Sequence, residues 1–515
     1  MNWEKIEVSS KILGHISAGV YRTTAGALKE LVSNAFDADA KRVVITTNHP
    51  SFDIITCRDN GSGIKADDFQ RIMRGGIGDS LKRVETDKTD LARPVIGRLG
   101  IGMLGIAQVC HQFKVISHHK ETKTAFQATV KLVDHLREKI DMENPEDEAR
   151  HEVGQYAIDE LDYDESHAGT YVVAADMRSA FVRKFRKNPG PSLPSKFSSF
   201  LNQIHKEKSV REIGDYWQMV WGLGIACPVP YTDGGPFNWE RVNASSEGQE
   251  AFEKFQAELM RYQFELVVDG LSLRKPITFP CPLLKRNSEE HMSGELFPVD
   301  EEMRVNGRPL KLFGYIYLQD GQAIEPMELR GILIRIRNVA IGVHDPTFLS
   351  YPKIEGPRFN WLTGEIYVTD GLEHALNIDR DSFNEMHPHF EALQQKIHKL
   401  LEDVFQKAGE GVKCRSTVKH EKEEQRKLFA LQELIKGELR HKYKIIESSD
   451  LPQPIYIDDQ KKKILIDEDH PLWPKAKSKR EIAKLIGVAF ELSMLASGSE
   501  RREKFYGLLS QILNL

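Results

Sequence analysis

The sequence predicts an α/β (α+β) protein whose first domain combines helices and strands, followed by a second α/β domain and a small α-rich C-terminal module. Three observations predict this architecture. The chain has 515 residues, more than one hydrophobic core supports, since domains commonly hold about 100–200 residues. Helical and strand periods of apolar residues alternate up to about Met177. A stretch rich in Pro, Gly, Ser and positive charge then precedes a region in which both periods occur.

These changes divide the chain into four segments. We expect a first domain over residues 1–182, a linker over 183–197, a second domain over 198–411 and a C-terminal helical module over 412–515. In the second domain, GILIRIRNVAIG (residues 331–342) is strand-like and FEALQQKIHKLLEDVF (residues 390–405) is helix-like. The last segment opens on a charged helical pattern and contains short strand-like pieces around Ile455 and Ile464.

The bulk composition excludes several classes of protein. With 40% hydrophobic and 29% charged residues the chain is typical of globular proteins, and its net charge of -5 argues against coating nucleic acid along its whole surface. We find no apolar signal core at the start and no long uncharged apolar run, so we expect a cytoplasmic protein without a membrane segment. The five cysteines include no C-x-x-C pair, which predicts reduced thiols. The acidic stretch over residues 141–165 is expected to be a solvated insertion between strands.

The first distinctive segment is KELVSNAFDADA, Lys29 to Ala40. Its neighbourhood places apolar residues at helical spacing, in one stripe that would pack on a sheet: Leu28, Leu31, Val32 and Ala35. Glu30, Asn34 and Asp37 fall on the opposite face. A solvated face of an ordinary helix has this composition too. The helix alone therefore leaves open whether these polar residues line a pocket.

Two strand-like runs follow, and the second ends directly in DNGSGI, Asp59 to Ile64. Asn-Gly favours a tight hairpin turn, but the next segment, KADDFQRIM, is a helix candidate and offers no partner strand. The alternative is a nucleobase pocket. Asp59 would accept a hydrogen bond from an exocyclic amine, while Gly61 and Gly63 would let the backbone approach a flat ring.

A polar, glycine-broken stretch from Gly75 to Pro94 is long enough to form a flap, and IGRLGIGMLGIAQV (residues 96–109) comes after it. The glycines of this run precede an apolar helix pattern: Gly97, Gly100, Gly102 and Gly105. Glycines at a helix start expose backbone N–H groups to an anion at the positive end of the helix dipole, so a phosphate chain can rest there. Close packing of the helix is the alternative reason for so many glycines.

Two common nucleotide motifs fit poorly. Gly100-x-Gly102-x-x-Gly105 matches the dinucleotide fingerprint, but the short segment before it contains Pro94, which cannot donate to a central strand ladder. The P-loop pattern G-x-x-x-x-G-K-[ST] is absent from the sequence, so a Walker-type ATPase is not supported.

The three segments in this order resemble the ATP-binding domain of the GHKL superfamily, which includes DNA gyrase, MutL proteins, MORC ATPases, large heat-shock chaperones and sensor histidine kinases. The resemblance covers roughly Ile6 to Met177 and implies a Bergerat-type sandwich of helices on a mixed sheet. Residues 16–40 look most like MutL and MORC proteins, and residues 96–109 look most like the chaperones. In AGTYVVAADM, Gly169-Thr170 resembles a fourth element, whose threonine helps to bind adenine.

The resemblance implies roles for individual residues toward ATP and Mg²⁺. Glu30 would be the general base that orients the attacking water, Asn34 the Mg²⁺ ligand, and Asp37 a supporting polar contact. Asp59 would bind adenine. The implied nucleotide contacts continue through the following residues: Gly61, Gly63, Ile64, Lys82, Gly97, Gly100, Ile101, Gly102, Met103, Leu104, Gly105 and Thr170.

The second domain resembles the transducer or middle domain that completes such a site. GEIYVTDGLEHALNIDRDSF (residues 364–383) is similar to the chaperone segment whose arginine senses ATP, which here is Arg380. A guanidinium suits a phosphate because its planar fork donates two parallel hydrogen bonds. A surface arginine paired with a neighbouring aspartate is the alternative. Arg335 and Arg337 lie at alternate positions of a strand-like run and are expected to face one side of a sheet.

Three functions remain open at this point. The first is an ATP-hydrolysing switch that closes or forms a homodimer on ATP and acts on nucleic acid in repair or defence, alone or with a companion subunit, with RKFRK (residues 183–187) as a candidate phosphate-contacting patch. The second is a chaperone-like ATPase acting on a client protein. The third is a nucleotide-gated scaffold with little turnover.

Overall fold

The structure, a computed structural model, describes most of the first 408 residues and short parts of the remainder. The described ranges are 3–9, 23–74, 105–106, 108–132, 150–207, 209–260, 264–281, 293–320, 323–377, 381–408, 444–447, 451, 455–458, 460–461, 463–466, 500, 503–504 and 507. The chain divides into two compact units, Met1–Lys413 and Cys414–Leu515. Each unit is considered by itself below.

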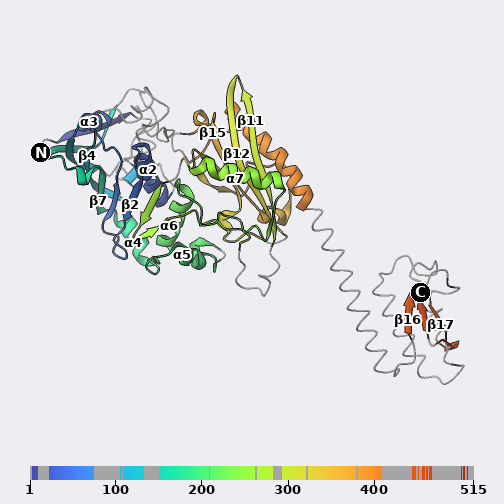
Figure 1. The fold of residues 1–515 in the computed structure, drawn as a ribbon. Coiled ribbons are helices and arrows are strands. Elements are labelled where there is room, and N and C mark those ends of the chain that lie inside the picture. The colour runs from blue at the N-terminus through green and yellow to red at the C-terminus, as the bar shows by residue number, and fades with distance from the viewer. Residues whose placement is uncertain are drawn as a thin grey trace. The chain divides into compact units, whose positions relative to one another are not determined.

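Within the described residues of the first unit, one mixed sheet has the strand order β1-β6-β5-β4-β7-β3-β2-β9-β10 (Figure 1). Its strands are β1 (Glu4–Ser9), β2 (Arg42–Thr46), β3 (Ile55–Asp59), β4 (Cys110–His119), β5 (Thr124–Leu132), β6 (Arg150–Leu161), β7 (Gly169–Met177), β9 (Glu265–Val268) and β10 (Leu271–Ser272). Neighbours are antiparallel except β2 and β9, which are parallel. Because β9 comes after the expected linker, this continuous sheet draws on residues from both sides of it.

The labelled helices of the unit are α2 (Thr24–Asp37), α3 (Ala66–Met73), α4 (Ser179–Lys187), α5 (Phe197–Ile204), α6 (Asp215–Ala226) and α7 (Ser246–Met260), and a further helix covers residues 388–408. The predicted helices at residues 29–40, 65–73 and 390–405 thus correspond to α2, α3 and the helix over 388–408. Helix α4 takes up the first five residues of the stretch expected as a linker. Phe181 and Phe185, one turn apart on α4, are both buried.

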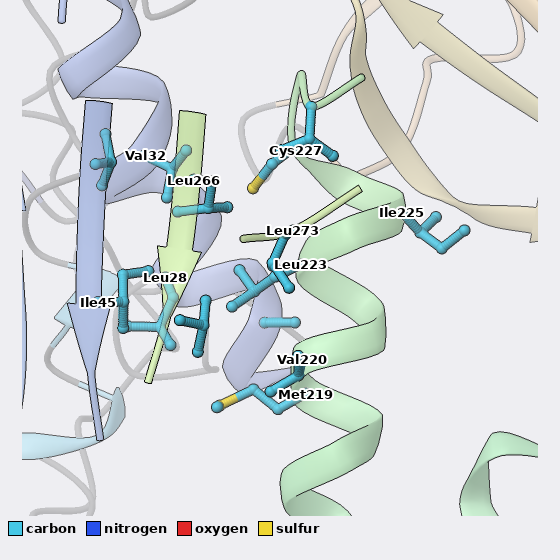
Figure 2. Close-up of a cluster of buried hydrophobic side chains, with 14 of the residues drawn as sticks. Leu28, Val32, Ile45, Met219, Val220, Leu223, Ile225, Cys227, Leu266 and Leu273 are labelled. Atoms are coloured by element: carbon cyan, nitrogen blue, oxygen red, sulfur yellow. The ribbon is translucent and has the colours of Figure 1, made fainter. Parts of the chain in front are cut away.

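Helix α2 is enclosed on nearly all sides. It begins where the Thr23 hydroxyl accepts a hydrogen bond from the Gly26 N–H at 3.0 Å, an N-cap contact. Figure 2 shows its Leu28 and Val32 among side chains from β2, β9 and α6. All but two of its 14 residues are buried. This packing fixes the helix firmly against both the sheet and α6.

A second sheet has the order β14-β13-β15-β12-β11-β8 among the described residues. Its strands are β8 (Val242–Asn243), β11 (Gly294–Val305), β12 (Arg308–Gln319), β13 (Gly331–Ile336), β14 (Val339–Asp345) and β15 (Leu362–Asp370). The helix over 388–408 belongs to its core through Leu393, Ile397 and Leu401, each fully buried. The strand-like run predicted over residues 331–342 is therefore the β13–β14 hairpin.

Two expectations for these sheets are wrong. Arg335 and Arg337 do not share a strand face, because β13 ends at Ile336 and Arg337 lies in the hairpin turn with φ 51°. The acidic stretch 141–165 is not only a solvated insertion, since it contains β6. Tyr156 and Ala157 of β6 are buried, while Glu160 of the same strand is exposed.

In the second unit, the described residues include a small sheet of β16 (Lys444–Glu447), β18 (Lys463–Ile466) and β17 (Ile455–Asp458), in that order. The strand-like pieces predicted around Ile455 and Ile464 are β17 and β18. Nowhere in the described ranges is a helix both long and apolar enough to cross a bilayer.

Candidate functional site

The loop after β3 is anchored to the C-terminal end of α2. The Ser62 N–H donates to the Ala38 carbonyl oxygen at 2.7 Å. A Cβ atom at Gly61 would lie 2.5 Å from that same oxygen, so a side chain there would push the loop away from the helix. The Asn60 side-chain oxygen accepts from the N–H groups of Lys41 and Arg42, each at 2.9 Å. These bonds bring the DNGSGI segment to the last turn of α2.

Asp59, the last residue of β3, lies at the centre of this arrangement. Its Oδ1 accepts from the Gly61 N–H at 2.8 Å and from the Thr170 N–H at 3.3 Å. Burial raises the pKa of the Asp59 carboxyl from 3.8 to about 6, against the N–H groups of Gly61 and Thr170 and the Lys120 charge, which lower it. The carboxylate is therefore ionised at neutral pH while held in a poorly solvated place, where it is a strong hydrogen-bond acceptor.

The residues after Asp59 run close to β4 and β7. Gly63 adopts φ +82°, and a Cβ there would lie 2.5 Å from the His118 carbonyl oxygen. The Ile64 N–H donates to Ser117 Oγ at 2.7 Å. Thr170, the second residue of β7, is buried. The structure therefore brings together Asp59, Gly61, Gly63, Ile64 and Thr170, which sequence analysis singled out from two separate segments.

Glu30, Asn34 and Asp37 share one side of α2, because their spacing is i, i+4 and i+7. Glu30 is 2% exposed and Asp37 8% exposed, while Asn34 is half-buried. The alternative reading of an ordinary solvated face is thus wrong for both acids. The loop carrying Asp59 contacts Ala38, the residue that follows Asp37 at the end of this helix.

Several expected site residues lie outside the described residues. They are Lys82, Gly97, Gly100, Ile101, Gly102, Met103, Leu104 and Arg380. Gly105 is described and buried, five residues before β4 begins. Asp381, the residue after Arg380, is described as well.

Sequence analysis missed two lysines near this site. Lys120 donates from its backbone N–H to the Ser62 carbonyl at 2.9 Å and from Nζ to the Asn60 carbonyl at 2.8 Å. Lys29, directly before Glu30, extends to the second domain, where its Nζ lies 2.7 Å from Asp381 Oδ1. Lys120 belongs to no motif. For Lys29, its position directly before Glu30 was the one feature of the sequence that could have pointed to the site.

The oxygen donors on α2 fit a magnesium ion that is held mainly by phosphates. The half-buried amide of Asn34 lies on the same helix side as the buried carboxylate of Glu30. Across the described parts of the chain, no group of three or more His, Cys, Asp or Glu is arranged to hold a metal by itself. Mg²⁺ in nucleotide sites commonly has only one or two protein oxygens and completes its shell with phosphates and water. The side-chain amide of Asn34 offers one oxygen of this kind.

Residues 21–167 match the family model described as histidine kinase-, DNA gyrase B-, and HSP90-like ATPase. This N-terminal segment is a member of the GHKL superfamily. Membership implies that the segment binds ATP, and the matched range contains the whole Asp59 loop and all of α2. The mixed sheet with helices packed against it agrees with the α+β fold expected from the sequence.

Curated relatives of the GHKL segment include proteins whose names refer to restriction and to DNA mismatch repair. One is a candidate type II restriction enzyme, HgiDII, of Herpetosiphon aurantiacus, 34% identical over 22% of this chain and 18% of its own length. Another is the DNA mismatch repair protein MutL of Lactobacillus delbrueckii subsp. bulgaricus, 35% identical over 24% of this chain and 19% of its own. The chain thus spans about a fifth of these relatives.

A solved structure described as the N-terminal domain of a DNA repair protein aligns with 76% of this chain and 97% of its own, at 12% identity and a TM-score of 0.36. A similarity of this size carries no conclusion about function.

Proposed function

We propose that the protein is an ATP-hydrolysing conformational switch that acts on nucleic acid. The observation that carries the ATPase part is the joining of the Asp59 loop to the end of α2, whose polar side holds the buried Glu30. Asp59, the proposed acceptor for adenine, and Glu30, the proposed general base, are thus carried by two segments that contact one another. Such pre-organisation is what hydrolysis of a bound nucleotide requires.

Adenine is held by Asp59 in this proposal. Its ionised carboxylate accepts a hydrogen bond from the exocyclic amine of the base. Gly61 and Gly63 support this contact indirectly: without side chains they let the loop pass close to the Ala38 and His118 carbonyls, which holds Asp59 in place. The Thr170 N–H, which donates to Asp59 at 3.3 Å, keeps the carboxylate in this orientation.

Glu30 is the proposed general base. Its carboxylate orients a water molecule and takes a proton from it as the water oxygen attacks the γ-phosphorus, and ADP and phosphate are released. Asn34 would hold Mg²⁺ through its amide oxygen, and Asp37 would support this contact through the same helix side. When bound, the cation neutralises phosphate charge. The burial of Glu30 keeps bulk water away from its carboxylate, which strengthens its interaction with the attacking water.

The second domain supplies Arg380 toward the γ-phosphate in this proposal. Asp381, the next residue, forms an ion pair with Lys29 on α2 at 2.7 Å, which supports a location of this segment close to the helix that carries Glu30. A guanidinium there would stabilise charge that develops on the transferred phosphoryl group. ATP binding would thus couple the GHKL segment to the second domain and favour dimerisation.

Nucleic acid is favoured over a client protein by helix α4. Its Phe181 and Phe185 are buried, while Arg183 and Lys187 are exposed. Lys184 pairs with Asp215 at 3.3 Å, so not every cation of this helix is available to a ligand. A phosphate backbone is the polyanion that an exposed Arg and Lys one turn apart would contact. The restriction and repair names of the relatives agree with this choice.

The first test is an ATPase assay with and without DNA over a range of salt concentrations. The second measures the oligomeric state of the protein with and without a non-hydrolysable ATP analogue. We expect turnover, a shift to dimer with the analogue, and DNA stimulation that weakens steeply with salt. Replacing Arg183 and Lys187 by Ala should reduce the slope of log affinity against log salt by about 0.9 for each lost phosphate contact. The matched control is Lys254→Ala, an exposed lysine on α7.

Other outcomes decide between the remaining functions. Stimulation by unfolded protein but not by DNA would support the chaperone-like function. ATP-dependent dimerisation with negligible turnover would support the scaffold. A chain that binds no ATP would overturn the whole proposal.

A further inference from the structure

Lys29 occupies an unusual place for a lysine. It lies on α2 directly before Glu30, yet only 2% of it is exposed. Its Nζ lies 2.7 Å from Asp381 Oδ1 and 3.5 Å from the Ala340 carbonyl oxygen of β14. A buried ammonium is tolerated only when opposite charge and hydrogen-bond acceptors surround it, so this contact fixes the position of the side chain. The side chain therefore links the GHKL helix to the second sheet.

The segment that carries Asp381 is itself held in place. Asn377 and Ser382 close its base, since the Asn377 N–H donates to the Ser382 carbonyl at 3.1 Å and the two side chains are 2.9 Å apart. Its backbone rests on β14 at Gly342, where φ is +71° and a Cβ would lie 2.8 Å from the Asp381 carbonyl oxygen. Asp381 is thus a fixed anchor for Lys29.

The second contact of Lys29, at Ala340, is backed by a buried polar network. Arg335 donates from Nε to Glu365 Oε1 at 2.6 Å and from Nη1 to the Asn338 carbonyl at 3.4 Å. Lys275 Nζ donates to Asn338 Oδ1 at 2.6 Å. These four side chains are all buried, and together they hold the turn from which β14 begins. A displacement of α2 would therefore have to break a contact with a rigid partner.

We propose that Lys29 is a positioning residue for ATP hydrolysis, which ties the helix carrying Glu30 to the second domain through Asp381. This inference rests on the proposed function. Lys29 and Glu30 are neighbours on one rigid helix, so a shift of α2 that separated Lys29 from Asp381 would also move the Glu30 carboxylate. A misplacement of about 1 Å at a reacting group can lower a rate by roughly 10²-fold. Lys29 thus acts on turnover and leaves nucleotide binding to the Asp59 loop.

Lys29→Met and Asp381→Asn test this role, each alone and together. We expect each single variant to lower kcat by about 10–100-fold, with the KM for ATP and the affinity for a non-hydrolysable analogue within about twofold of wild type. The double variant should be no slower than the slower single one, because both changes remove the same contact. Lys29→Arg should restore part of kcat. The matched control is Lys311→Met, which removes an exposed pair with Glu302 at 3.1 Å and should leave kcat unchanged.

Three results would overturn the role of Lys29: an unchanged kcat in Lys29→Met, losses that multiply in the double variant, or an equal loss of ATP affinity. If Lys29→Met fails to fold, Asp381→Asn and Lys29→Arg carry the same comparison. A wild-type protein that binds ATP without turnover, or binds none, overturns the proposed function itself before any variant is compared. Normal wild-type turnover with an unaffected Lys29→Met overturns the inference alone.

Discussion

Replacing Asp59 by Asn should make the folded protein more stable and its ATP binding weaker. The two effects have opposite signs because one carboxylate serves both. In the free protein its negative charge is held in a poorly solvated place, which disfavours the folded state. In the proposed complex the same charge accepts a hydrogen bond from adenine. Asn keeps an oxygen for the Gly61 and Thr170 N–H groups but carries no charge.

The stability change follows from the pKa. Burial raises the pKa of Asp59 from 3.8 to about 6 in the folded state. Between these values the folded protein binds more protons than the unfolded chain, so the free energy of unfolding falls as pH rises and is constant above about pH 6. At 1.36 kcal/mol for each pKa unit, the ionised carboxylate costs the folded state roughly 3 kcal/mol at neutral pH. The Asn variant should regain up to that amount at pH 7 and nothing at pH 3.

The binding change follows from hydrogen bonding. If the side-chain oxygen of the introduced Asn stays with the two N–H groups, its amide nitrogen is directed at the adenine amine, and two donors then meet. Leaving such a buried partner unsatisfied costs about 1–3 kcal/mol, or roughly 5–150-fold in Kd. Wild-type affinity should also weaken below about pH 6, as Asp59 becomes protonated.

Urea unfolding at two pH values and calorimetric titration with a non-hydrolysable ATP analogue measure both effects. Asp59→Glu is a control that keeps the charge. An Asn variant less stable than wild type at pH 7 would refute the stability argument. Undiminished affinity for the analogue would refute the role of Asp59 toward adenine.

Three further predictions follow from single residues. Glu30→Ala should lower turnover by roughly 10²–10⁴-fold, the usual loss for a general base, with ATP affinity kept; phosphate release and calorimetry check this, and a parallel loss of affinity would contradict it. Gly63→Ala should destabilise the fold by at least about 1 kcal/mol, because φ is +82° and the new Cβ would lie 2.5 Å from the His118 carbonyl; an unchanged melting temperature would speak against it. Glu365→Gln should cost about 3–5 kcal/mol in urea unfolding by leaving Arg335 without its buried countercharge, and adding Arg335→Met should recover part of the loss.

Local patterns predicted much of the fold. The apolar stripe of α2 and the short alternating runs of β2 and β3 depend on side-chain spacing alone, which is readable from sequence. The pairing of Asp59 with Thr170 is different, since 111 positions separate them and only the antiparallel contact of β3 with β7 brings them together. The sequence analysis expected both residues to bind adenine, Thr170 by resemblance to a family, but it did not predict this hydrogen bond.

Long-range features were missed for the same reason. Lys29 and Asp381 are 352 positions apart, and no periodicity couples them. Arg335 lies in a strand as expected, but the sequence did not indicate that it is fully buried with Glu365 of the neighbouring strand β15 as its charge partner. The pairing of β9 with β2 is also long-range, because α6 and α7 lie between the two strands in the sequence.

The most direct test of the central claim is a crystal structure of the protein with Mg²⁺ and a non-hydrolysable ATP analogue. It should place the adenine amine about 3 Å from Asp59, the metal against Asn34, and the γ-phosphate on the side of α2 that carries Glu30. A nucleotide bound elsewhere, or one that contacts neither Asp59 nor Asn34, would contradict the account.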